Sequence, residues 1–109
     1  MSYSQALADR VRHALRDQRG VTEKKMFGGV GFLLHGNMLV GIWHNSLIAR
    51  LNPSDAEAAL REAHIRVFDV TGRPMKGWIM IDPEGLDTDQ QLSHWLDLAL
   101  TFVATLPRK

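Results

Sequence analysis

Three short apolar runs follow one another in the middle of the chain, at residues 31–34, 38–43 and 47–51. The first break between them is the pair Gly36 and Asn37. Glycine suits the first position of a two-residue hairpin loop because it takes positive φ at little cost. The second break, at residues 44–46, is polar and typical of a tight turn. Loops this short join antiparallel neighbours, so the pattern predicts three consecutive antiparallel strands.

The predicted turns decide which side chains share a face of this sheet. With Gly36 and Asn37 as the loop, Leu33 lies opposite Val40, and one face is almost wholly apolar and suited to packing under helices. The other face is still too apolar for free contact with water, so we expect it to meet a terminal segment, a second subunit or a partner. A three-residue second loop would reverse the third strand. The side chains expected on this second face are Phe32, Leu34, Leu39, Trp43, Ile48 and Arg50.

Helical spacing of apolar residues predicts three helices around these strands. The first covers residues 3–18, with a serine cap at its start. The second begins at Asn52 and Pro53, a capping residue followed by proline in the first turn. The third begins with a capping box at Thr88, carries the strongest apolar stripe in the chain and stops at Pro107.

Two further strands, at residues 66–70 and 76–81, complete the predicted order, and residues 21–27 form an extended lead into the first strand. The order α-β-β-β-α-β-β-α, with about five mainly antiparallel strands, predicts an α+β domain of two layers. At 109 residues the chain is long enough for one domain, residues 1–109, with its own core.

Composition narrows the class of protein and its compartment. Hydrophobic residues make up 45% of the chain and charged residues 23%, as in an ordinary globular protein. The absence of cysteine excludes a disulfide scaffold, thiol catalysis and thiolate metal sites, and it fits a reducing compartment. No apolar run reaches the ~18 residues of a membrane span, and the N-terminal stretch lacks the apolar core of a signal peptide. We therefore expect a cytoplasmic protein that does not contact membranes.

Charge gives no overall sign of a nucleic-acid-binding protein, because the net charge is +1. Its distribution is uneven, and residues 9–25 are rich in cations. This stretch is interpreted either as the solvated face of a helix or as a weak patch for an anionic partner. The cations in it are Arg10, Arg12, Arg16, Arg19, Lys24 and Lys25.

Glycines 28, 29 and 31 lie close together, but they do not form a phosphate loop. Such a loop needs a helix N-terminus directly after the glycines, with its amides aimed at the anion. Here a strand and a hairpin follow. We therefore expect a bulge or a close approach of two backbones.

The sequence offers no catalytic signature. None of the five histidines lies at metal-ligand spacing from another. Asp82 and Glu84 lie in a turn rich in proline and glycine, without the distinct environments that an acid–base pair needs. Ser46, Thr71 and Thr88 lie in turns or caps without a nucleophile elbow. We therefore predict no enzyme activity, no catalytic residue, no metal ligand and no cofactor.

The segment GRPMKGW, at residues 72–78, brings Arg73, Lys76 and Trp78 together. Arginine and tryptophan supply much of the binding energy at protein interfaces, and an aromatic ring flanked by bases also suits anionic ligands. The simpler interpretation is a turn shaped by Gly72 and Pro74, with a core tryptophan and solvated cations. Together with the N-terminal lysines, the candidates for an anionic ligand are Lys24, Lys25, Arg73, Lys76 and Trp78.

Three pieces of the chain, KKMFGGVGFLLHGNMLVGI, SLIARL and GRPMKGWIMIDPEGL, resemble the N-terminal domain of the TfoX/Sxy family of bacterial competence regulators. They are especially similar to its short stand-alone members. The likeness covers nearly the whole chain, and M-F-G-G-x-G-F at residues 26–32 is its most specific piece. The resemblance implies a two-layer sandwich like that of secretion chaperones and supplies no catalytic residues. Family members that regulate DNA uptake carry a second, helical C-terminal domain and act with a transcription activator.

These observations favour a non-catalytic regulatory or protein-interaction module, linked through the family to transcription or competence regulation. We expect a protein partner, with the transcription machinery as one candidate, and a homodimer. The alternative is direct binding of nucleic acid through the basic first helix and Arg73, Lys76 and Trp78. A third hypothesis is a small-molecule site near the glycines and Trp78. The expected interaction surface comprises Phe32, Leu34, Trp43, Ile48 and Arg50.

Overall fold

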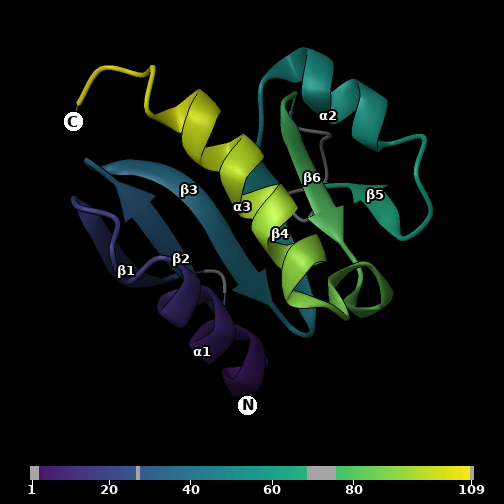
Figure 1. Cartoon of the computed structure of the whole chain (residues 1–109), viewed down its shortest axis with the longest axis horizontal. Coiled ribbons are helices and arrows are strands. Elements are labelled where there is room, and N and C mark those ends of the chain that lie inside the picture. Colours follow the sequence, from purple (N-terminus) through teal and green to yellow (C-terminus); the bar gives the residue numbers. More distant parts are fainter. Residues whose placement is uncertain (1–2, 27, 69–75, 109) are drawn as a thin grey trace.

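The computed structural model describes residues 3–26, 28–68 and 76–108, and these form an antiparallel sheet with helices packed on it (Figure 1). The strand order is β1-β2-β3-β4-β6-β5, and every neighbouring pair is antiparallel. The predicted α+β class is confirmed. The strands are β1 (Val21–Met26), β2 (Gly29–Leu34), β3 (Asn37–Trp43), β4 (Ser46–Arg50), β5 (Ile65–Val67) and β6 (Trp78–Ile81).

The described sheet has six strands and not five, because β1 pairs with β2 along its whole length. Its sequence VTEKKM has no alternating apolar pattern, so the segment was predicted to be extended but was not counted as a strand. The reason is its place in the sheet. An edge strand with exposed side chains buries little, and so it carries little hydrophobic signal.

Three α-helices pack on one face of the sheet and build the main core with it. Figure 1 shows α1 and α3 lying across the same face, with α2 beside β6. The short 3-10 helix η1 (Pro83–Leu86) connects β6 to α3. The bounds of the α-helices are α1 (Gln5–Ala14), α2 (Pro53–Ala59) and α3 (Asp89–Val103).

Side-chain caps define where the helices begin. Ser4 Oγ accepts a hydrogen bond from the Leu7 amide at 3.1 Å at the start of α1. At the start of α3, Thr88 Oγ1 accepts from the Gln91 amide at 3.1 Å, and Gln91 Oε1 accepts from the Thr88 amide at 2.9 Å. The predicted capping box is confirmed. The first helix is shorter than expected, because the chain leaves helical geometry after Ala14.

The first hairpin loop is His35 and Gly36, so the predicted loop of Gly36 and Asn37 is wrong by one residue. His35 has φ 52° and Gly36 has φ 85°, and positive φ at both positions is the signature of a type I′ turn. Asn37 instead begins β3 opposite Leu34, and its buried amide Nδ2 donates to the Pro107 carbonyl at 2.8 Å. This bond ties the hairpin to the C-terminal segment.

A bulge in β3, and not the shifted loop, changes the faces of β2. Phe32 lies opposite Val40 and Leu33 opposite Met38, so Leu39 is an extra residue on its strand. Phe32 and Leu34 consequently belong to the main core under the helices, each only 1% exposed. The prediction that these two side chains and Leu39 lie on the second face is wrong, because all three belong to the main core.

The second hairpin agrees with the predicted faces. Its loop has two residues, because Trp43 pairs with Ser46. Ile42 therefore faces Leu47 on the helix side, and Ile48 lies on the opposite side. The alternative three-residue loop is excluded.

The face opposite the helices carries a small second core. Ile48, Phe68 and Met80 are buried there, and Trp43 and Trp78 pack against them while remaining half-buried. The β4–β6 part of this face is therefore closed by side chains of the chain itself. On the β2–β3 part, Leu33 and Met38 are half-buried.

Candidate functional site

Two tryptophans lie on the sheet face opposite the helices, and an arginine at the end of β4 lies near one of their rings and near a ring of α3. Trp43 ends β3, Arg50 ends β4 and Trp78 begins β6, and all three side chains are half-buried. Arg50 lies opposite Trp78 in the sheet ladder, whereas Trp43 lies at the other end of β4, where it pairs with Ser46. The second core fills the space between the two ends. We call Trp43, Arg50 and Trp78 the aromatic–arginine surface.

Arg50 is held by aromatic rings. Its Cζ atom lies 5.6 Å from the ring centroid of Trp78 and 5.9 Å from that of Phe102 on α3. A guanidinium within about 6 Å of a ring centroid is attracted by the negative ring face. Arg50 forms no ion pair with a described residue. Its charge is thus positioned but not neutralised by a carboxylate.

Arg66 on the same face is different, because an acidic side chain neutralises it. Its Nη2 donates to Asp82 Oδ1 at 2.6 Å and its Nε donates to the same carboxylate at 3.0 Å. Ser46 Oγ donates to that carboxylate at 3.4 Å. This pair joins β5 to the end of β6, so we assign it a structural role.

The predicted basic patch on the first helix is largely engaged with protein groups. Arg12 forms ion pairs with Asp9 and with Glu23 of β1. The hydrogen bond that Arg12 donates to the Glu23 carboxylate raises the pKa of Arg12, so the guanidinium stays charged and bound. Arg16 donates to the carbonyl of His13 at 2.7 Å within its own helical turn. Because these guanidinium groups already bind protein groups, they are less available to an anionic ligand than the sequence suggests.

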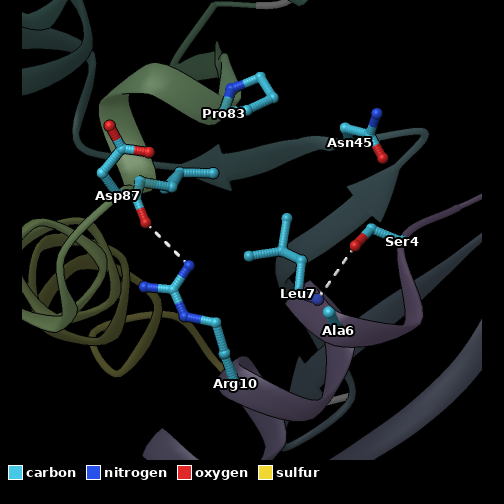
Figure 2. A pocket seen from close by; sticks show the side chains of 8 residues that line it. Ser4, Ala6, Leu7, Arg10, Asn45, Pro83 and Asp87 are labelled. Carbon is cyan, nitrogen blue, oxygen red and sulfur yellow. Dashed lines mark hydrogen bonds between the residues drawn. The ribbon is translucent and has the colours of Figure 1, made fainter.

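Arg10 fastens α1 to the segment between β6 and α3. Its Nη1 donates to the Leu86 carbonyl at 2.8 Å, and its Nη2 lies 3.4 Å from Asp89 Oδ1. The hollow beside it, about 300 Å³, is lined also by Ser4, Asn45 and Asp87. Figure 2 shows Arg10 reaching across toward the segment of Asp87, with the Ser4 cap at the opposite wall. Because Arg10 is already bonded to Leu86 and Asp89, we interpret this hollow as a gap between packed elements and not as a ligand site.

Two other hollows border α3. One, of about 500 Å³, separates α1 from α3 and mixes both signs of charge, including Arg16 and Asp89. The other, of about 320 Å³, contains His64 and His94. Within the described residues, no group of three or more histidine, aspartate or glutamate side chains is arranged to hold a metal ion.

The structure divides the residues predicted for an anionic ligand into separate places. Lys24 and Lys25 are exposed on β1, whereas Lys76 is exposed just before β6. Three strands lie between β1 and β6, so at about 4.8 Å per strand the two places are roughly 19 Å apart. Arg73 lies outside the described residues. Trp78 joins Arg50, which links it to the expected interaction surface.

That expected interaction surface is also divided. Phe32 and Leu34 lie in the main core, and Ile48 is 5% exposed beneath the second face. Trp43 and Arg50 remain accessible. The sequence reasoning did not include Phe102 in the site, because its place in the helical stripe of α3 indicates a core residue. Only the packing of α3 beside the end of β4 brings its ring to Arg50.

The fold is thus a two-layer α+β domain whose described helices cover one sheet face, and whose other face presents half-buried aromatic and basic groups. The TfoX N-terminal domain family matches the chain over residues 13–103, and the chain belongs to this family. Comparisons with curated proteins and with solved structures give no match. In the described part of the chain, none of the helices has the length and apolar character needed to cross a membrane.

Proposed function

We propose that this TfoX N-terminal domain is a non-catalytic protein-interaction module that acts in regulation. The observation that carries the proposal is the aromatic–arginine surface on the face that the helices leave uncovered. Tryptophan and arginine are the residue types that most often dominate binding energy at interfaces. The regulatory part of the proposal, including a link to transcription or competence, rests on family membership.

The placement of Arg50 suits partner binding for two reasons. Its guanidinium already lies near the rings of Trp78 and Phe102, so less side-chain freedom is lost when a partner binds. Its charge is not paired with a described carboxylate, so an acidic group of a partner can accept its planar array of donors. The partner is therefore expected to place a carboxylate over Arg50 and apolar groups beside Trp43.

Affinity capture from lysate of the source organism, after nuclease treatment, tests the proposal. We expect the wild-type chain to retain specific proteins that both Arg50→Ala and Trp43→Ala lose. Arg61→Ala is the matched control, because Arg61 is exposed and lies outside the surface. Equal retention by all variants would contradict the proposal, provided that circular dichroism shows each variant to be folded.

The homodimer stays a prediction. Among the described large apolar side chains, Leu60 and Val67 are the exposed ones, at 37% and 40%. Stable homodimers usually bury a larger apolar area, which favours a different protein as partner. Light scattering after size exclusion, at high and low protein concentration, measures the mass that decides between monomer and dimer.

Nucleic-acid binding stays the alternative, with exposed Arg19, Lys24, Lys25 and Lys76 as its remaining described cations. It requires affinity for DNA or RNA that falls steeply with salt, because bound phosphates release counterions. The engagement of Arg10 and Arg12 with protein groups makes this alternative weaker. Gel retardation at low and high salt, repeated with Lys76→Ala, tests it.

A further inference from the structure

β1 is an edge strand whose outer side is open. It pairs with β2 and with no other described strand, and Figure 1 shows it at the margin of the sheet. The His35 amide donates to the Gly20 carbonyl at 2.9 Å, which fixes the phase of the ladder. Since antiparallel pairs alternate between bonded and non-bonded positions, Thr22 and Lys24 also bond toward β2.

The main-chain groups of Val21, Glu23 and Lys25 consequently point away from β2. No described main-chain or side-chain group outside the β1–β2 ladder bonds to them. Each offers one N–H donor and one carbonyl acceptor along the open edge. This is the arrangement that an added strand uses, with main-chain hydrogen bonds supplying affinity.

The side chains of β1 make this edge positively charged. Its carboxylate, Glu23, is held by the Arg12 guanidinium through Nε and Nη2. Lys24 and Lys25 are exposed and form no ion pair with a described residue. The edge therefore presents two unneutralised ammonium groups, one toward each face of the sheet.

A second copy of β1 fits this edge poorly. In the two antiparallel registers of longest overlap, the two-fold axis passes through Glu23 or through Lys24. The first register places Glu23 opposite Glu23 of the other copy, and the second places Lys24 opposite Lys24. The second register also places Glu23 opposite Lys25, but Arg12 already neutralises Glu23. Like charges directly opposite each other destabilise a strand pair, and lysine on an edge strand blocks self-association.

We propose that the outer edge of β1 binds an extended acidic segment of another protein by strand addition. Carboxylates on both faces of the added strand would lie beside Lys24 and Lys25. The inference rests on the proposed function in that the partner is a protein. The β1 edge is separate from the aromatic–arginine surface, however, so experiments can contradict one proposal and leave the other.

NMR titration of the 15N-labelled chain tests the proposal with a capped peptide of about seven residues, in which two adjacent glutamates, one for each face of the strand, lie between valines. We expect shifts and slowed amide exchange at Val21, Glu23 and Lys25. Two control peptides separate pairing from charge. One carries N-methyl groups on every second residue and keeps its charge, and the other replaces glutamate by lysine. Neither control is expected to bind.

Variants of β1 sharpen the test. Lys25→Pro removes one outward donor without touching the ladder to β2, because edge strands accept proline at such positions. It should weaken the acidic peptide more than Lys25→Ala, which removes only the charge. Reversing both charges with Lys24→Glu and Lys25→Glu should weaken binding about tenfold, as expected for two exposed ion pairs.

Several outcomes would overturn the inference. They are equal binding of the N-methylated peptide, shifts confined to residues around Arg50, no response at millimolar peptide, a dimer that pairs through β1, and stronger binding of single-stranded nucleic acid than of the peptide. Partner capture that is lost in Arg50→Ala and unchanged in Lys25→Pro would also remove the inference and leave the proposed function. Peptide binding at β1 with no captured partner would instead leave this inference and contradict the proposed function.

Discussion

Gly29 lies so close to the backbone of β3 that a side chain does not fit there, and this explains part of the glycine-rich stretch. A Cβ atom there would overlap the Ile42 carbonyl oxygen, which belongs to the backbone and cannot move aside. We predict that Gly29→Ala lowers the free energy of unfolding by roughly 2–3 kcal/mol. The measurement is urea denaturation followed by circular dichroism.

Gly41→Ala is the matched comparison. A Cβ at Gly41 meets the terminal Cε of Met38 at 3.1 Å, and that flexible side chain can shift. The expected loss is no more than about 1 kcal/mol. Equal losses at the two glycines would show that the close approach at Gly29 is not the reason for its side chain being absent.

His35 occupies a left-handed turn position that asparagine adopts more easily than a β-branched residue. We predict that His35→Asn keeps the free energy of unfolding, whereas His35→Val lowers it by about 1–2 kcal/mol. Thermal and urea unfolding of the two variants provide the measurement. A tolerated valine would contradict the assigned turn.

The sequence could not decide this turn by itself. Gly36 suits the first position of a loop formed with Asn37 and equally the second position of a loop formed with His35. In either case the other residue of the loop is polar. The deciding factors are the bulge at Leu39 and the bond from Asn37 to Pro107, which both depend on tertiary packing. The bulge at Leu39 explains the misplacement of Phe32 and Leu34, because it reverses the faces of β2 relative to β3, whereas the shift of the turn alone does not.

Among the elements, α3 was the most predictable because a capping box and a continuous apolar stripe agree. We predict that Thr88→Ala lowers the free energy of unfolding by about 1 kcal/mol, because an orphan amide at the helix start loses its acceptor. Thr88→Ser keeps the hydroxyl and should keep most of that stability. If serine cost as much as alanine in chemical denaturation, the cap would not be the cause.

The strand β1 was the least predictable element, for the same reason that makes it a docking candidate. Its side chains are mostly exposed and charged, so hydrophobic periodicity does not mark it. Its main-chain groups remain open on one side because no described strand follows it. Whether a strand lies at the edge depends on the order of strands in the sheet, and the local sequence pattern does not determine that order.

For the whole molecule, the two layers followed from the order of elements, but the closure of the second face did not. Sequence alternation correctly placed Ile48 opposite the helix side, and it placed Trp78 and Met80 together. It did not show that Phe68 and Met80 would bury Ile48, or that Phe102 would reach Arg50. These contacts join segments far apart in the chain.

The surface opposite the helices thus divides into a buried part, at Ile48, and an accessible part, at Arg50. Equilibrium unfolding of Ile48→Asp, beside Arg50→Ala, tests it most directly. We predict that Ile48→Asp lowers the free energy of unfolding by at least about 3 kcal/mol, because it buries an unpaired carboxylate, while Arg50→Ala changes it by about 1 kcal/mol or less. An Ile48→Asp variant as stable as the wild-type chain would contradict the account and show that the face is open.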